Sequence, residues 1–337
     1  MVKHLLIGGR RFSQKPTPST RATVLGTLLL MVLAGFVNVD PASTDAVAFP
    51  LATGPNVVRS QISSCPHPGL KPGRHKRTTI WEGVERWYGI NVPPASVSGK
   101  PLPMVLNLHP FALGGNPLYR RIWRHESGLA DVGNAEGFVT VQPDGTGMPA
   151  SWNGGEECCG EASANEVDDV GFIRHLIDLV AEETCIDRSR VYAAGMSNGG
   201  YLSHRLGCEA SDVIAAIAPV VGSFSKELTC DLDRRVPVLQ ISGSEDNLDS
   251  RTESVERWLD LNDCTGDPVV TYQKGVATCH TWQTCADGVK VSHCIVEDGG
   301  HCWFSDIVPQ ATPGCRPMDD LVSQEMVWDF VSQWSLP

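Results

Sequence analysis

The chain lacks an excess of positive charge. Its 27 lysines and arginines are outnumbered by 39 aspartates and glutamates, which gives a formal net charge of −12. Proteins that bind nucleic acid through the phosphate backbone need a basic surface, so we expect no nucleic-acid partner. The chain also has no internal repeat and no low-complexity tract. Its hydrophobic content of 42% is normal for a globular protein.

A long apolar run lies near the N-terminus. Val24–Val37 (VLGTLLLMVLAGFV) follows several basic residues and precedes Ala46-Val47-Ala48. This order of basic, apolar and small residues predicts a secretory signal peptide over residues 1–48. The run is shorter than the roughly 20 residues that a transmembrane helix needs. We therefore expect a secreted, extracellular protein, and the alternative is a membrane anchor formed by an uncleaved N-terminal segment.

The cysteine pattern lacks the C-x2-C pairs that are typical of zinc sites. All twelve cysteines lie beyond the signal segment, and their number is even. In an oxidising compartment this predicts disulfides, each contributing about 2–4 kcal/mol. Cysteines and histidines between Cys279 and Cys302 are close in sequence, so a structural metal is the alternative. We expect disulfides and no metal.

The hydrophobic pattern predicts an α/β fold. Residues 49–77 form an extended lead-in that Cys65 could tie down, and residues 78–93 form an edge hairpin with a Glu82-Gly83 turn. Nearly continuous apolar strands then alternate with helical patterns, which is typical of a mainly parallel central sheet with helices on both faces. We expect a single catalytic domain over residues 78–337. The predicted strands are 103–109, 138–142, 190–195, 214–222, 236–243 and 291–297, and the clearest helices follow Asp168-Asp169 and cover 322–334.

A candidate nucleophile lies in the stretch GMSNGGY, residues 195–201, directly after an apolar strand. The pattern G-x-S-x-G between a strand and a helix holds a serine on a tight turn, where its hydroxyl is exposed for attack. Ser197 occupies that position. A serine hydroxyl is a weak nucleophile, so it needs a base, a group that orients the base and donors for an oxyanion. The alternative for GMSNGGY alone is an ordinary glycine turn.

The chain contains a base and an acid in the required order. Asp246 follows the strand VPVLQISG, and His301 follows a later strand and two glycines. Nucleophile, acid and histidine occur in this order in α/β-hydrolases. Glu245 and Asp249 are rivals for the acid. Other histidines are expected to have structural positions, with His293 in a strand, His280 in a cysteine-rich loop and His204 on a helix surface.

The oxyanion hole is expected to combine the backbone N–H of Asn198 with one from the loop after the first parallel strand. That loop begins His109-Pro110-Phe111. Proline has no N–H, so the second donor must be Phe111 or a neighbour. His109 is expected to support the loop rather than act as a base.

Together these segments resemble a known family, the secreted polyhydroxybutyrate depolymerase and feruloyl esterase group of α/β-hydrolases. The similarity covers roughly residues 78–335 and also extends to acetylxylan esterases. It rests on QPDGTG (142–147), SWN (151–153), Cys158-Cys159-Gly160, VDDVGFIRHLIDLVAE (167–182), RVYAAGMSNGGY (190–201), RLGCE (205–209), GSEDN (243–247) and GGHCW (299–303).

The resemblance implies an α/β-hydrolase fold and hydrolysis of carboxylic esters by Ser197, His301 and Asp246, without a cofactor or a stable partner. The chain departs from the family's usual His-Gly at His109-Pro110, which puts the oxyanion loop in question. Cys302 and Cys315 are additional, and could close a loop beside His301.

The expected substrates are hydroxycinnamoyl esters of plant cell walls or short polyesters. The alternative enzyme is an acetylxylan esterase. Trp152, Tyr201 and Trp303 are candidates for substrate binding near the site, although aromatic side chains such as Trp152 can belong to the core instead. A catalytically silent carbohydrate-binding protein on the same fold is the rival from another class.

Overall fold

The computed structural model describes Cys65 and residues 69–111, 115–306 and 315–337. The chain divides into two units, residues 1–56 and 57–337, and only the second contains described residues. The predicted signal peptide and most of the predicted lead-in therefore lie outside the described residues. None of the helices in this part of the chain is long and apolar enough to cross a lipid bilayer.

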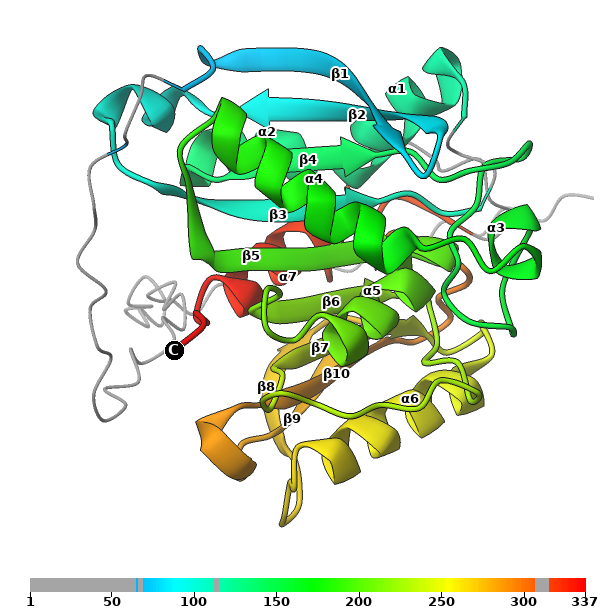
Figure 1. The fold of residues 1–337 in the computed structure, drawn as a ribbon. Helices are drawn as coiled ribbons and strands as arrows, with labels where there is room; N and C mark the ends of the chain where they lie inside the picture. The colour runs from blue at the N-terminus through cyan, green and yellow to red at the C-terminus, as the bar shows by residue number, and fades with distance from the viewer. Residues whose placement is uncertain (1–64, 66–68, 112–114, 307–314) are drawn as a thin grey trace, which may run out of the picture. The chain divides into compact units, whose positions relative to one another are not determined.

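A ten-stranded sheet runs through the described unit in the order β1-β2-β4-β3-β5-β6-β7-β10-β9-β8 (Figure 1). The strands from β4 to β10 in this order run parallel, and antiparallel pairs flank them on both sides. The strands are β1 (Gly73–Trp81), β2 (Val84–Val92), β3 (Leu102–Leu108), β4 (Val139–Pro143), β5 (Ile186–Met196), β6 (Ala216–Val220), β7 (Val238–Gly243), β8 (Val269–Lys274), β9 (Ala277–Trp282) and β10 (Val291–Val296).

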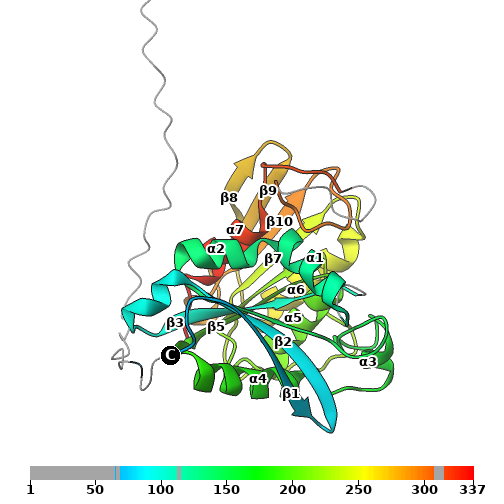
Figure 2. The same ribbon diagram turned by 90° about the horizontal axis from the view of Figure 1, so that it is seen from above.

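Helices cover both faces of the sheet (Figure 2). One apolar core joins α4, α5 and α6 to the sheet, and a second joins α1, α2 and α7 to its other face. Burial on both faces explains why β3, β6 and β7 are mostly apolar, and the polar side chains of Asn107 and Gln240 within them are buried too. The predicted α/β-hydrolase architecture is confirmed. The helices are α1 (Pro117–Ser127), α2 (Leu129–Glu136), α3 (Glu161–Ala164), α4 (Asp169–Glu183), α5 (Asn198–Glu209), α6 (Leu248–Leu261) and α7 (Ser323–Val331), with 3-10 turns at Pro94–Ser98 and Ala286–Gly288.

The hairpin at the first edge of the sheet agrees with the sequence prediction. Its strands β1 and β2 are joined at Glu82 and Gly83, which have φ values of 48° and 79°. Positive φ at both central residues is the geometry that matches the twist of a two-residue hairpin. The hairpin begins at Gly73, so the predicted boundary at residue 78 falls inside β1.

The opposite edge carries a second hairpin, β8–β9, that the apolar pattern does not predict. His280 lies in β9 and pairs with His293 of β10, so its predicted position in a loop is wrong. The strand alternates buried and half-buried residues, and its polar positions hide it from a search for apolar runs.

Disulfides connect all twelve cysteines. The predicted loop closure beside His301 is present as Cys302–Cys315. Cys65 joins Cys185, just before β5, and so ties the lead-in to the sheet. The remaining pairs are Cys158–Cys159, Cys208–Cys230, Cys264–Cys285 and Cys279–Cys294.

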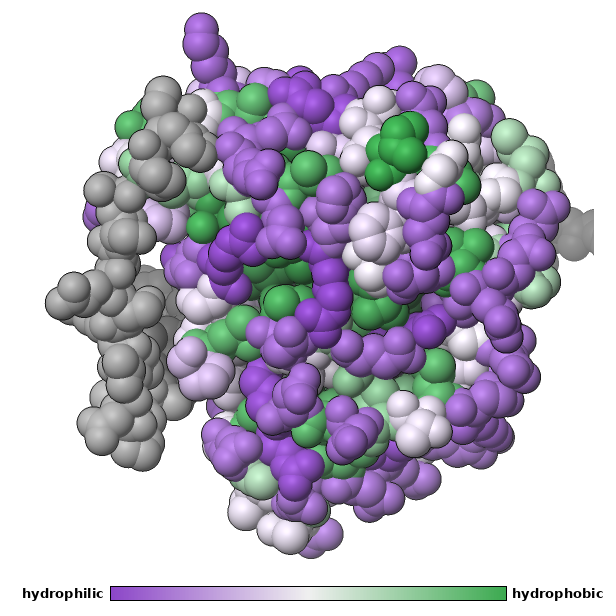
Figure 3. All heavy atoms as spheres, viewed as in Figure 1, coloured by the Kyte–Doolittle hydropathy of each residue, from purple (hydrophilic) through white to green (hydrophobic). Residues whose placement is uncertain are grey.

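The face drawn in Figure 3 is mostly hydrophilic. Large apolar side chains are exposed mainly one or two at a time, as is normal for a globular protein. At the edges of the sheet they are Ile80 on β1, Val84 on β2, and Val269 and Val270 on β8.

Candidate active site

Ser197 lies on a tight turn between β5 and α5. Its backbone has φ 53° and ψ −119°, a conformation that side-chain-bearing residues rarely adopt. The backbone N–H of Ser197 donates to the carbonyl of Val220 on the neighbouring strand at 2.9 Å. The surrounding sheet therefore holds the serine in a strained turn, as the G-x-S-x-G pattern predicts.

Glycines around Ser197 let neighbouring backbone segments approach closely. A Cβ atom at Gly199 would collide with the carbonyl oxygen of Leu108, at the end of β3. A Cβ atom at Gly200 would lie 3.0 Å from the Cα of Gly222, after β6. The turn is thus wedged between the ends of two strands, which explains why the sequence has glycine at both positions.

Asp246 and His301 form a hydrogen-bonded pair. The Nδ1 atom of His301 lies 2.8 Å from Oδ2 of Asp246. The rival carboxylates of Glu245 and Asp249 belong to exposed residues. The geometry therefore favours Asp246 as the partner of the histidine.

The loops that carry this pair fit together through glycine. A Cβ atom at Gly243, the last residue of β7, would collide with the carbonyl oxygen of Gly299. The N–H of Glu245 donates to that carbonyl at 2.8 Å. Close contact between the two loops places Asp246 and His301 beside each other.

Arg251, which lies one turn into α6, has no recognisable signal in the sequence. Its Nη2 atom lies 3.1 Å from Oδ2 of Asp246 and 2.7 Å from the carbonyl oxygen of Val221. The side chain of Arg251 is only 5% exposed. It forms a buried charge-assisted contact that fixes the same carboxylate oxygen as His301.

The three predicted catalytic residues follow β5, β7 and β10, which run parallel. They therefore lie at the carboxyl edge of one sheet, where ligands bind in open α/β folds. Asp246 and His301 are in direct contact, and Ser197 lies on the turn at the same edge. This arrangement can support nucleophilic chemistry with a serine hydroxyl and an oriented imidazole.

His109 supports the loop after β3. Its Nε2 atom accepts a hydrogen bond from the N–H of Gly145 at 2.9 Å, and Nδ1 lies 2.8 Å from the carbonyl oxygen of Pro110. Nδ1 therefore carries the proton and donates to that carbonyl. Complete burial lowers the pKa of His109 to about 4, so the ring is neutral at pH 7. These contacts agree with the expected supporting position of His109.

The two predicted oxyanion residues differ in exposure. The side chain of Asn198 is buried, and its amide bridges the backbone of Trp152, accepting from N at 2.7 Å and donating to O at 3.0 Å. Phe111 is 38% exposed and immediately precedes residues 112–114, which lie outside the described residues. The backbone N–H groups of Asn198 and Phe111 remain the predicted donors.

Two of the three predicted substrate-binding aromatics belong to the core. Trp152 and Trp303 are fully buried. The indole of Trp152 donates from Nε1 to the carbonyl of His109, and that of Trp303 donates to Gln324. Neither ring has a free face for a substrate, so both predictions are corrected. Tyr201 in α5 is half-buried and stays a candidate.

His204 is fully buried, so its predicted position on a helix surface is wrong. Its Nδ1 atom accepts from the indole of Trp258 at 2.9 Å, and Nε2 lies 3.1 Å from Oε1 of Gln240. Burial lowers the pKa of His204 to about 3 and keeps the ring neutral. The ring stacks on Phe224, which supplies the apolar surroundings.

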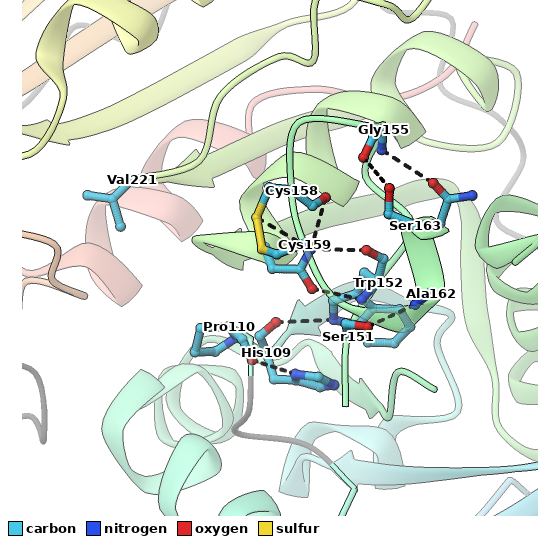
Figure 4. Close-up of a disulfide and its surroundings, with 12 residues drawn as sticks. His109, Pro110, Ser151, Trp152, Gly155, Cys158, Cys159, Ala162, Ser163 and Val221 are labelled. Atoms are coloured by element: carbon cyan, nitrogen blue, oxygen red, sulfur yellow. Dashed lines mark hydrogen bonds between the residues drawn. A yellow bond between two sulfur atoms is a disulfide. The ribbon is translucent and has the colours of Figure 1, made fainter. Parts of the chain in front are cut away.

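A cleft of about 330 Å³ is lined by residues between 156 and 166, a segment that contacts Asn198 through Cys158. Ser197, Asp246 and His301 do not line this cleft. The disulfide between the adjacent Cys158 and Cys159 forms part of its wall. Figure 4 shows this disulfide above Trp152. The Nδ2 atom of Asn198 lies 3.9 Å from Sγ of Cys158. All twelve cysteines are in disulfides, so none of them is available as a metal ligand. The described residues also contain no cluster that could hold a metal ion.

The fold and the serine turn define an α/β-hydrolase. The family model of the prolyl oligopeptidase family matches residues 127–311, more than half of the chain. The chain therefore belongs to the prolyl oligopeptidase family, and the predicted membership of the α/β-hydrolase superfamily is confirmed. A solved acetyl xylan esterase from Aspergillus awamori shares the fold, with a TM-score of 0.56 at 12% identity over 77% of this chain and 99% of that one.

Curated relatives of the chain are named as esterases. Feruloyl esterase B of Piromyces equi is 29% identical over 272 residues, which are 74% of this chain and 45% of that protein. The bifunctional acetylxylan esterase/xylanase XynS20E of Neocallimastix patriciarum is 29% identical over 246 residues, 69% of this chain and 31% of that protein. The chain thus spans less than half the length of either relative. The predicted resemblance to the feruloyl esterase group is confirmed.

Proposed function

We propose that the chain is a serine carboxylic-ester hydrolase. The observation that carries this proposal is the strained Ser197 turn at the same sheet edge as the hydrogen-bonded Asp246–His301 pair. The esterase names of the relatives support the reaction class.

In the proposed mechanism, Oγ of Ser197 attacks the ester carbonyl while His301 takes the hydroxyl proton. The oxyanion of the tetrahedral intermediate is held by the backbone N–H groups of Asn198 and Phe111. His301 then gives the proton to the leaving alcohol, and an acyl-enzyme remains on Ser197. Water, activated by the same imidazole, releases the acid and restores the serine.

Asp246 orients the base in this mechanism. Because its carboxylate contacts Nδ1 of His301, the Nε2 atom is left to accept the serine proton. The imidazolium that forms is stabilised by the negative carboxylate. Arg251 holds that carboxylate in place through the same oxygen, Oδ2, that contacts the histidine.

The proposed substrates are esters of plant cell walls, either hydroxycinnamoyl or acetyl esters. The proposal follows the names of the two relatives, feruloyl esterase and acetylxylan esterase. A short hydroxybutyrate polyester is the alternative substrate that the sequence motifs suggest. The six disulfides support action in an oxidising, extracellular compartment.

The decisive test is the Ser197→Ala variant. We expect its kcat on a p-nitrophenyl acyl ester to fall about 10⁶-fold, since removal of a nucleophile abolishes the covalent route. The wild type should also be labelled by a fluorophosphonate probe, and the variant should not. Unchanged hydrolysis by the variant would contradict the mechanism. A wild type that neither hydrolyses esters nor accepts the probe would support a catalytically silent binding protein.

Substrate class is tested by comparing kcat/KM on methyl ferulate, an acetylated xylan and a hydroxybutyrate oligomer. A peptide p-nitroanilide is assayed beside them, because other members of the family are peptidases by name. We expect the cell-wall esters to be preferred. Preference for the oligomer or the anilide would overturn the proposed substrate class without affecting the serine mechanism.

A further inference from the structure

The segment Ser151–Ala162 forms a closed loop beside the nucleophile turn. Its base is fastened where the N–H of Ala162 donates to Oγ of Ser151 at 3.1 Å. A second link joins Oγ of Ser163 to the carbonyl of Gly155 at 2.7 Å. The Cys158–Cys159 disulfide lies within this loop, between Gly155 and Ala162 (Figure 4).

One end of the loop contacts the residue that follows the nucleophile. The amide of Asn198 is clamped by both backbone groups of Trp152. Its Nδ2 atom also lies 3.5 Å from the carbonyl oxygen of Cys158 and 3.9 Å from its Sγ. The side chain of Asn198 thereby lies between Trp152 and Cys158 of the loop.

Gly160, the residue that follows the disulfide, contacts the second predicted oxyanion residue. A Cβ atom at Gly160 would lie 2.8 Å from Cε2 of Phe111 and 2.7 Å from Oγ of Ser151. Gly160 directly follows the disulfide and has φ 80°, where glycine is favoured. The same loop therefore contacts the side chains of both residues whose backbone N–H groups form the predicted oxyanion hole.

We propose that the Cys158–Cys159 disulfide is a positioning pair that holds the oxyanion hole in its active geometry. A disulfide between neighbouring residues closes a small ring and removes freedom from the intervening peptide. The Cys158 carbonyl then keeps its direction toward Asn198, and Gly160 stays against Phe111. Preorganised donors are the largest single contribution in many hydrolases, so small displacements of the loop change the rate.

This inference rests on the proposed ester hydrolysis, and its test is the double variant Cys158→Ser/Cys159→Ser. We expect kcat to fall about 10-fold with KM little changed, a smaller loss than the roughly 10²–10³-fold cost of deleting an oxyanion donor. The loss should be similar for methyl ferulate and a p-nitrophenyl acetate. An unchanged kcat, or a KM effect that differs between substrates, would overturn the positioning role.

The matched control is Cys264→Ser/Cys285→Ser, which removes a disulfide at the far end of α6. A helix of 14 residues places it roughly 20 Å from the Asp246 end, at about 1.5 Å per residue. We expect this control to lose thermal stability and keep its kcat at a temperature where both variants are folded. Equal losses of kcat in the two variants would show a general stability effect and contradict the proposal.

A double-mutant cycle separates positioning from loss of structure. Asn198→Ala keeps the backbone N–H and removes the amide that joins the turn to the loop. The combined variant carries Asn198→Ala together with Cys158→Ser/Cys159→Ser. If the disulfide acts through this amide, the combined variant should lose no more activity than whichever of the two parent variants loses more. Additive losses would overturn the proposal. Wild-type hydrolysis together with an inactive Ser197→Ala variant would leave the proposed function standing in either case.

Discussion

The two sides of the candidate active site are held together in different ways. On the nucleophile side, backbone approaches backbone, and Gly199 and Gly200 lie where no side chain fits. On the acid–base side, side chains contact side chains, and His301 is 36% exposed. The nucleophile side is therefore sensitive to added atoms, and the acid–base side is sensitive to lost polar groups.

The largest effect on the acid–base side is expected from Asp246→Asn. The amide is nearly the same size, so the fold should remain intact. The asparagine lacks the charge that stabilises the imidazolium, and its amide favours the wrong tautomer of His301. The same substitution in a related triad lowers kcat about 10⁴-fold. Ester hydrolysis and circular dichroism measure the two effects. Glu245→Gln is the control, and an equal loss of kcat there would contradict the assignment of the acid.

An intermediate effect is expected on the nucleophile side from Gly199→Ala. The added methyl group must displace the backbone at Leu108, which costs about 1–3 kcal/mol of stability. A displacement near 1 Å at Ser197 also lowers kcat about 10²-fold.

The control for this prediction is Gly266→Ala, at φ 78° with open space around it. That substitution carries only the backbone strain of a positive φ, roughly 1–2 kcal/mol, and should keep kcat. Thermal unfolding and kcat are measured for both. If Gly199→Ala kept full activity, the close packing of the turn would have no functional consequence.

The smallest effect concerns pH and the buried histidines behind the nucleophile side. The pKa of His204 is lowered to about 3 by burial, against about 6.5 in the unfolded chain. Below pH 6.5 the unfolded state therefore binds more protons than the folded state. The free energy of unfolding falls as a result while the pH drops from 6.5 toward 3. At pH 5 the loss is about 2 kcal/mol for one such histidine.

Urea unfolding at pH 7.5 and pH 5.0 measures this difference. In His204→Gln the difference in unfolding free energy between the two pH values should shrink by about 2 kcal/mol, because the variant has no imidazole at this position. The exposed His125 provides the control, and His125→Gln should keep the wild-type pH dependence. A wild-type stability that rises on acidification would contradict the neutral, buried state of His204.

The sequence predicts the parallel strands well because burial on both faces demands continuous apolar runs. The predicted strand 236–243 and the observed β7 (Val238–Gly243) differ by two residues. The order of Ser197, Asp246 and His301 is equally visible, because each follows such a strand. The contact of Asp246 with Arg251 and that of Asn198 with Trp152 are not visible in the sequence, since they depend on distances across the fold rather than along the chain.

Burial of large or polar side chains was harder to predict. Trp303 and His204 lie close to the nucleophile or the histidine in sequence, yet both rings face the core. Each satisfies its polar atoms with a partner far along the chain, Gln324 for Trp303 and Trp258 for His204. A local pattern carries no information about such partners. The disulfide connectivity was hidden for the same reason.

The edges of the sheet bear on how the molecule behaves at high concentration. An unpaired edge strand is a template on which another copy can add a strand. On β1, Arg74, Lys76 and Arg77 oppose such pairing, because two copies would bring like charges together. On β8 a register shift between Val270 and Tyr272 interrupts the ladder next to two exposed valines. Repulsion between cations at one edge and irregular strand geometry at the other therefore both oppose the addition of a strand from a second copy.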